Sequence, residues 1–264
     1  MRSVKKIAIV GGGPSALFAI MACADCGIIP DVFYRELRLQ PGAFWFHWVP
    51  DWIDSVVSSS SIRIGSVGTR RDYIEKQWKN PPESYTSSFP ENQKLEEGYD
   101  PKEVSKLIFE SHLFNRIPLE ENLTDKDLFG LKKRRYDLVF HSFPTSDARN
   151  AYKDLFVRFP TITTVHPGNG VFSNSVIYNG FRDSEIVRSS FLWGVYHVEL
   201  VSDSTRFREW TPAPVYTVEL IPFEGSVDPL QLSDSIVPIG RMARFERPLL
   251  SHETYKLVRD YIER

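Results

Sequence analysis

Residues 5–20, KKIAIVGGGPSALFAI, decide the fold class of this chain. Four apolar residues of strand length, Ile7 to Val10, end at three glycines, and a helix-forming run follows at once. A strand, a glycine turn and a helix in this order place a pyrophosphate on backbone N–H groups at a helix N-terminus. The sequence therefore predicts an α/β fold whose Rossmann-like parallel sheet binds a dinucleotide.

The small residues of this turn have separate roles. Gly11 lets the chain turn sharply, and Gly13 carries no Cβ that would block the phosphates. Ala16 takes the third small position, where helix and strand only need to pack closely. Pro14 suits the first turn of the helix. We expect the phosphates to lie against Gly11, Gly13, Pro14, Ser15 and Ala16.

An acidic residue is expected at the end of the second strand of such a fold. Residues 31–36, DVFYRE, have the pattern of that strand, and Glu36 ends it, 25 positions after Gly11. The usual separation is about 20 residues. Glu36 is thus expected to accept hydrogen bonds from the adenosine ribose hydroxyls. The alternative is a glycine-rich turn in an α/β protein that binds no nucleotide.

Composition and charge fit an ordinary globular protein. The chain has 264 residues, 42% of them hydrophobic and 25% charged, and a formal net charge of −2. The net charge of the chain therefore gives no overall electrostatic attraction to nucleic acid or to an anionic membrane. The basic runs at 70–71 and 132–135 are interpreted as solvated faces, with a nucleic-acid contact as the alternative.

The two cysteines bear on the compartment. Cys23 and Cys26 have C-x-x-C spacing but fall late in the first helix, so we interpret them as buried free thiols rather than a redox pair. Free thiols suit a reducing cytosol, and no stretch is long enough to span a membrane. We expect a cytoplasmic protein without a membrane partner.

Several local signals position the later helices. Asp100-Pro101-Lys102-Glu103 is a capping box with proline at the first helical position. Thr69 and Thr124 each precede a further helix, and residues 251–262 have the apolar spacing of a closing helix.

The chain divides into two predicted lobes. Short strand-like runs separated by Gly, Asn, Pro and Asp predict a smaller antiparallel-sheet substrate lobe; they are 161–165, 175–178, 191–200 and 215–220. The nucleotide-binding domain is assigned to residues 1–50, 101–145 and 226–264. The substrate lobe takes residues 51–100 and 146–225, with a lid-like loop over 81–98 that is rich in Pro, Ser, Asn and Glu.

Two further segments are expected beside the cofactor. Residues 44–48, FWFHW, have a density of aromatic side chains that neither helical nor strand amphipathicity explains. We interpret them as a wall beside a planar cofactor, with core packing as the alternative. Residues 136–144 have the pattern of a buried strand that ends in a turn. Because the carboxyl ends of parallel strands face the ligand, Ser142 and Pro144 should lie near the cofactor.

With these pieces placed, the chain resembles the flavoprotein group that includes UDP-galactopyranose mutase and the flavin amine oxidases. The matching segments are 11–16 with Glu36, 136–144, 178–180 with 187–190, 237–241, and 42–48. The resemblance implies FAD, with Gly42, Phe46, Ser142, Pro144, Gly240 and Arg241 among its contacts. The chain is much shorter than those relatives, so a mutase activity is not implied.

FAD also fits better than a nicotinamide cofactor. A flavoprotein needs a late strand and helix that return to the cofactor, and the Gly240 turn with the closing helix can supply that return. Residues 65–68, GSVG, lack the spacing of a second nucleotide motif for NADPH. Electrons are therefore expected from the organic substrate or from a separate reductase.

The reaction expected is oxidation of a C–H bond next to an amine or hydroxyl by hydride transfer to flavin N5, on a small polar or amino-acid-like substrate. His47 is the base candidate because imidazole titrates near neutral pH. Arg188 could grip a substrate carboxylate or phosphate with two hydrogen bonds, and Tyr178 could line the pocket. Each has a structural alternative: a core or aromatic-cage histidine, a salt bridge and core packing. No His/Cys cluster has metal-ligand spacing.

Three other functions stay open. A flavin-dependent lyase or modifying enzyme could act on a nucleotide or DNA base, guided by the basic runs and the 81–98 loop. A reduced-flavin mutase could act on a nucleotide sugar. An FAD-binding protein without turnover belongs to a different class, and an ordered FAD that substrates never reduce would favour it.

Overall fold

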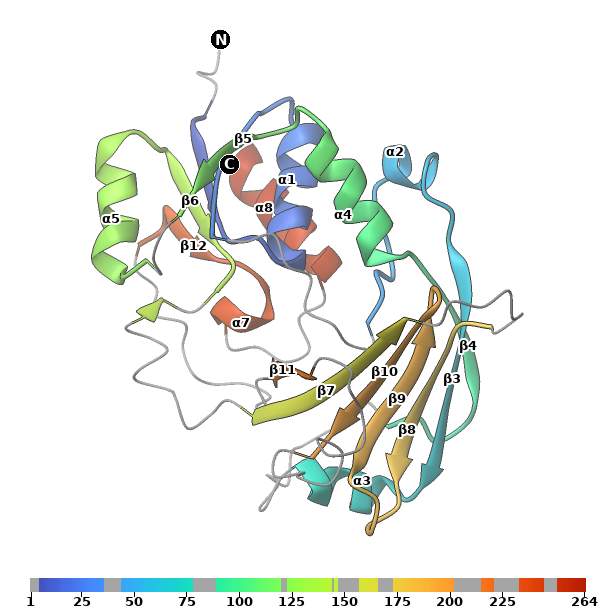
Figure 1. The fold of residues 1–264 in the computed structure, drawn as a ribbon. Helices are drawn as coiled ribbons and strands as arrows, with labels where there is room; N and C mark the ends of the chain where they lie inside the picture. Colours follow the sequence, from blue (N-terminus) through green and yellow to red (C-terminus); the bar gives the residue numbers. More distant parts are fainter. Residues whose placement is uncertain are drawn as a thin grey trace.

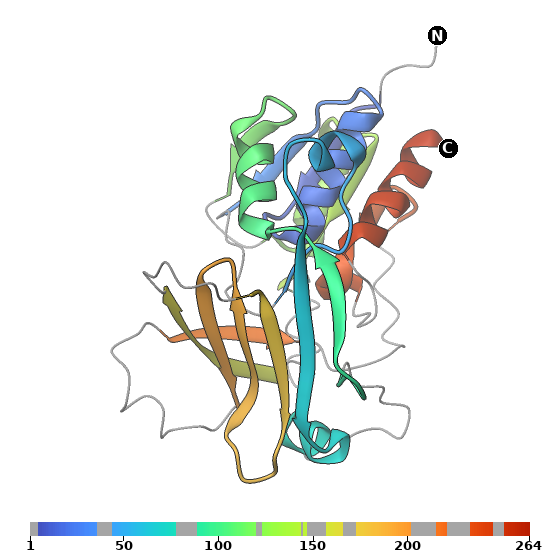
Figure 2. The same cartoon turned by 90° about the vertical axis from the view of Figure 1, so that its right-hand side faces the viewer.

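The computed structural model describes residues 5–35, 44–77, 89–119, 123–143, 145–146, 157–165, 173–201, 215–220, 233–244 and 251–264. Its strands form two sheets, one in the upper and one in the lower part of both views (Figures 1 and 2). The first sheet is parallel throughout, as predicted, in the order β12-β6-β1-β2-β5. Its strands are β1 (Ile7–Val10), β2 (Asp31–Tyr34), β5 (Asn115–Pro118), β6 (Leu138–His141) and β12 (Ile236–Pro238).

Helices cover both faces of the parallel sheet (Figure 1). One face packs on α1 (Pro14–Asp25), α4 (Pro101–Glu110) and α8 (Ser251–Glu263), and the other packs on α5 (Asp125–Arg134). Successive side chains of each strand point to opposite faces of the sheet. Phe140 of β6 is fully buried with α1 and α8, whereas its neighbour Val139 packs towards α5.

The predicted capping residues begin their helices. The Asp100 carboxylate accepts a hydrogen bond from the Lys102 N–H at 2.8 Å, before α4. Thr124 and Asp127 form a reciprocal capping box at the start of α5. Such caps satisfy N–H groups that the helix itself leaves unpaired.

The second sheet has seven strands in the order β11-β7-β10-β9-β8-β3-β4. They are β3 (Ser60–Gly68), β4 (Lys94–Gly98), β7 (Val157–Val165), β8 (Ser175–Gly180), β9 (Ile186–Leu192), β10 (Val195–Leu200) and β11 (Val215–Leu220). The prediction of an antiparallel sheet is wrong at one pairing, because β3 and β8 run parallel. These two strands come from distant parts of the chain, so no tight turn forces them to be antiparallel.

Two local predictions need correction. Residues 191–200 do not form one strand, because Trp193 (φ 48°) and Gly194 (φ 78°) make a two-residue hairpin turn between β9 and β10. The lid-like loop predicted over 81–98 is wrong for residues 94–98, which form β4 and pair with β3. Residues 78–88 lie outside the described part of the chain.

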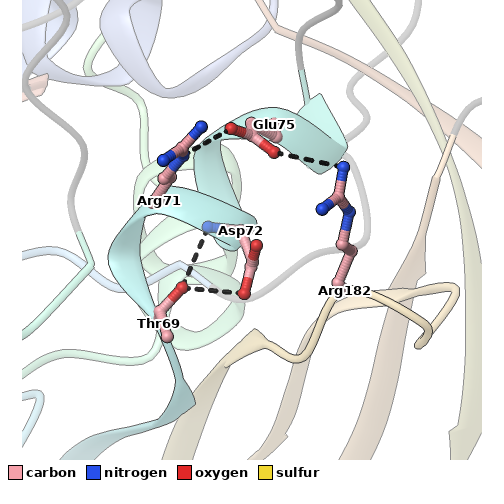
Figure 3. A network of polar contacts seen from close by, with 5 residues as sticks. All are labelled: Thr69, Arg71, Asp72, Glu75 and Arg182. Atoms are coloured by element: carbon pink, nitrogen blue, oxygen red, sulfur yellow. Dashed lines mark hydrogen bonds and ion pairs between the residues drawn. The ribbon is translucent and has the colours of Figure 1, made fainter.

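Helix α3 (Arg70–Gln77) closes the end of the second sheet that lies away from the parallel sheet (Figures 1 and 2). Thr69 caps it as predicted, because its Oγ1 accepts the Asp72 N–H at 3.1 Å (Figure 3). Glu75 links Arg71, within α3, to Arg182 in the turn between β8 and β9. The Lys76 ammonium donates to the carbonyl oxygens of residues 179 and 186, both at 3.0 Å, so α3 is tied to that hairpin.

Candidate cofactor and substrate site

The glycine turn after β1 is fixed by contacts that only glycine allows. Gly11 has φ +129°, a backbone conformation that other residues rarely adopt, and a Cβ there would overlap the Ser142 side chain. The Gly11 N–H donates to the Phe33 carbonyl oxygen at 2.7 Å, and the Ser142 N–H donates to that of Val10 at 2.9 Å. The turn is thus held between the carboxyl ends of β2 and β6.

Gly13 differs from Gly11 because the space beside it is open. It is the N-cap of α1 with φ −90° and ψ −175°, and no side chain caps this helix. A Cβ built on Gly13 would meet no atom within 4 Å. An uncapped first turn beside open space is the geometry in which N–H groups and the helix dipole receive a phosphate, so this loop fits the pyrophosphate of a dinucleotide.

The last parallel strand returns the chain to this loop. The Ile239 N–H donates to the His141 carbonyl oxygen at 2.8 Å, and Gly240 (φ +76°) follows directly. A Cβ on Gly240 would overlap the side chain of Ser15, so the turn before α7 (Gly240–Arg244) packs on the first turn of α1. Three segments far apart in the sequence therefore meet at one edge of the parallel sheet.

Some predicted cofactor contacts cannot be placed. Glu36, Gly42 and Pro144 lie outside the described residues, as does the side chain of Arg241. Their roles stay predictions.

The aromatic segment 44–48 joins the two layers. Phe46 is buried, and its ring lies 5.1 Å from that of Phe18 in α1. Its backbone exchanges two hydrogen bonds with Tyr99, just beyond β4. On either side of Phe46, Trp45 packs on Gly98 and His47 faces Glu96 of β4. Core packing, the alternative interpretation, therefore describes Phe46 itself, while its neighbours reach the second sheet.

His47 is 39% exposed, and its Nδ1 lies 3.5 Å from Glu96 Oε2. Partial burial lowers the pKa of His47 from 6.5, although Glu96 opposes this shift. His47 also borders a surface hollow of about 430 Å³, which it lines with Trp48, His252, Tyr255 and Lys256. A neutral imidazole at the edge of a hollow can accept a proton at pH 7.

Strand register places Arg188 and Tyr178 directly opposite each other, on β9 and β8. The Arg188 guanidinium lies 5.5 Å from the centre of the Tyr178 ring. The same face of the sheet carries Glu96, the partner of His47. The three predicted catalytic residues therefore lie on or above one face of the second sheet.

Arg188 and Tyr178 are also held by structural partners. The expected two-pronged contact of Arg188 is made with Glu199 of β10, at 2.9 Å and 2.7 Å. Tyr178 is 6% exposed and packs against Tyr73 and Phe89. This face thus holds a largely buried ion pair beside an aromatic cluster.

Sequence reasoning missed two histidines. His197 of β10 pairs through Nδ1 with Thr163 Oγ1 at 3.0 Å, and burial lowers its pKa to about 4. His141 ends β6, where its Nδ1 lies 3.0 Å from the Phe143 carbonyl oxygen and burial lowers its pKa. Recognising the turn at Trp193–Gly194 would have aligned His197 and Glu199 with β9, because alternate residues share a face.

The described residues hold neither a cluster of metal ligands nor a membrane-spanning helix. No three His, Cys, Asp or Glu side chains there are grouped as ligands of a metal ion. None of the helices in those ranges has the length and apolarity needed to cross a bilayer. Both thiols are free, as predicted, but only Cys23 is buried; Cys26, near the end of α1, is partly exposed.

Comparison with known proteins gives matches only in three dimensions. No family model matches the sequence, and no curated protein sequence matches it. Reduced UDP-galactopyranose mutase matches with 10% identity and a TM-score of 0.55, over 98% of this chain and 95% of that one. A flavin-dependent halogenase from Xanthomonas campestris matches with 10% identity and a TM-score of 0.52, over 99% and 70% of the two chains. A flavin-dependent brominase matches with 11% identity and a TM-score of 0.52, over 98% and 79%.

The chain has the fold of flavin-dependent enzymes. The predicted α/β architecture and the likeness to the mutase are thus confirmed at the level of fold. TM-scores of 0.52 and 0.55 support the shared fold, whereas identities of 10% leave the reaction to be inferred from this chain's own residues.

Proposed function

We propose that this chain is an FAD-dependent enzyme that oxidises a C–H bond next to a hydroxyl or amine of a small polar substrate. One observation carries the proposal: Gly11, Ser142 and Gly240, from three distant segments, converge around an uncapped helix N-terminus with open space beside Gly13. An uncapped first turn leaves its N–H groups available to a phosphate.

The residues that would hold FAD follow from this geometry. The backbone of 12–15 would receive the diphosphate, and the packing of Gly240 on Ser15 would keep the late turn beside it. Glu36 would bind the adenosine ribose, and Gly42, Pro144 and Arg241 are proposed as further contacts. When bound, FAD supplies a two-electron hydride acceptor.

Proton transfer at the substrate is assigned to His47. Its lowered pKa keeps the imidazole neutral at pH 7, so it can accept a proton. Glu96, 3.5 Å away, would stabilise the imidazolium that forms. Arg188 would position other groups on its face of the sheet rather than bind a substrate carboxylate, because Glu199 already takes its two-pronged contact.

The test is anaerobic reduction of the FAD-loaded protein by a panel of alcohols, amines and amino acids. Loss of the flavin absorption band with an alcohol or amine, slowed by His47→Gln, is the expected result. The amount of oxidised product formed should equal the amount of flavin reduced. A bound flavin that no member of the panel reduces would contradict the oxidation and favour a binding protein without turnover.

A further inference from the structure

On the face of the second sheet that carries Arg188, the part over β7, β9 and β10 holds buried polar side chains beside the apolar cluster of β3 and β8. Thr161, Ser190, Glu199 and His197 are 0%, 3%, 4% and 7% exposed. The opposite face carries Ile162, Val198 and Leu200, which pack together. A buried polar group costs free energy unless it finds a partner, and of these four side chains Ser190 is the one whose buried polar atom has none within the described ranges.

This polar face is turned towards the parallel-sheet layer. Trp45 and His47 contact it at the β4 end, while Phe46 between them packs on α1. Lys102, at the start of α4, lies within electrostatic range of His197. In both views the second sheet lies below the parallel sheet and its helices (Figures 1 and 2).

Ser190 and His197 lie directly opposite each other on β9 and β10. The Ser190 hydroxyl is buried and has no hydrogen-bond partner within the described ranges. The Thr163 hydroxyl is hydrogen-bonded to Nδ1 of His197, so Nε2 is the ring nitrogen that can contact a ligand. A hydroxyl without a hydrogen-bond partner and an imidazole with one of its two ring nitrogens bonded thus lie on adjacent strands.

The charges of this face cancel. Arg188 and Glu199 form a hydrogen-bonded pair of opposite charge. Burial keeps His197 neutral at pH 7, against the opposing effect of Glu199. The counter-charges on the face are already paired, Arg188 with Glu199 and Lys94 with Glu96, and Lys102 lies off the sheet. A charged ligand group would therefore be desolvated against paired charges, whereas a neutral hydroxyl could pair with both open polar atoms.

We propose that Ser190 and His197 bind a hydroxyl group of an uncharged substrate, which makes the substrate an alcohol rather than an amine or a carboxylic acid. The assignment rests on the proposed FAD-dependent oxidation and narrows its substrate class. Both residues determine specificity, and His47 keeps the role of base.

Two serine variants of the apo protein test the vacant hydroxyl. Ser190→Ala removes a buried hydroxyl without a partner and should raise Tm by roughly 2–4 °C. Ser66→Ala is the matched control on β3, because its hydroxyl donates to the Pro90 carbonyl oxygen at 2.7 Å. That variant should lower Tm by a similar amount. A lower Tm for Ser190→Ala would show that its hydroxyl is structural and would overturn the assignment.

A thermal-shift panel on the FAD-loaded protein tests the substrate class. The probes are sugar alcohols of three to six carbons and the corresponding amino alcohols and sugar acids. Sugar alcohols should raise Tm of the wild type more than their charged counterparts, and Ser190→Ala should lose at least half of that shift. Equal or larger shifts with the charged probes, or none with any alcohol, would overturn the assignment. Failure to load FAD would contradict the proposed function instead, and the apo comparison of the serine variants would still show whether the Ser190 hydroxyl is structural.

Discussion

Replacing Gly13 with valine should abolish tight FAD binding while leaving the fold intact. The backbone at Gly13 has φ −90°, which valine adopts without strain, and a Cβ there meets no protein atom within 4 Å. Loss of glycine freedom in the unfolded chain stabilises a compatible site by about 0.4–1 kcal/mol. The free energy of unfolding should therefore stay within about 1 kcal/mol of the wild type.

The effect on FAD follows from the same open space. The valine methyl groups would occupy the volume proposed for a phosphate and would separate it from the N–H groups of the first turn. Hydrogen bonds to a charged group contribute about 1.5–3 kcal/mol each. Losing one such bond raises Kd by roughly 10- to 150-fold, and steric exclusion adds to this loss.

Flavin fluorescence titration gives Kd for FAD, and urea unfolding gives stability. Gly130→Ala is the matched control. Gly130 lies within α5, away from the proposed diphosphate site, and a Cβ there also meets no atom within 4 Å. It should leave Kd unchanged. A Gly13→Val protein that unfolds cooperatively and still binds FAD with the wild-type Kd would refute the placement of the diphosphate.

Three further predictions follow from the contacts around the site. Gly240→Ala should destabilise the protein by at least about 2 kcal/mol in urea unfolding, since it combines positive φ with overlap on Ser15; an unchanged midpoint would contradict that packing. Glu199→Leu should cost about 3–5 kcal/mol because it leaves the Arg188 charge buried, and Arg188→Met in the same protein should restore much of the loss; additive losses would argue against a coupled pair. The pKa of His197 falls from 6.5 to about 4 on folding, so the unfolded state binds more protons between these values. Stability should therefore fall as pH drops from 6.5 to 4, by at most ~1.4 kcal/mol per pH unit, and His197→Gln should flatten the slope; an equal slope in the variant would assign the protons elsewhere.

The parallel sheet could be predicted because its signals are local. An apolar strand, three glycines and proline at the first helical position lie within ten residues, from Ile7 to Ala16. The caps at Thr69, Asp100 and Thr124 are equally local, since each side chain bonds within three residues of itself. Such short-range chemistry can be deduced from sequence without knowing the tertiary fold.

The second sheet shows where this reasoning ends. The parallel pairing of β3 with β8 joins segments more than 100 residues apart, and no neighbouring residue encodes it. The hairpin at Trp193–Gly194 was missed because tryptophan is an uncommon residue at positive φ. The packing of Gly240 on Ser15 likewise depends on the order β12-β6-β1, which only the assembled sheet provides.

The most direct test of the central claim is the absorption spectrum of the purified protein after incubation with FAD and removal of free nucleotide. If the uncapped turn at the start of α1 receives the FAD diphosphate, the protein should retain the flavin absorption bands at one FAD per chain. A folded protein that emerges colourless and takes up no FAD would contradict the claim.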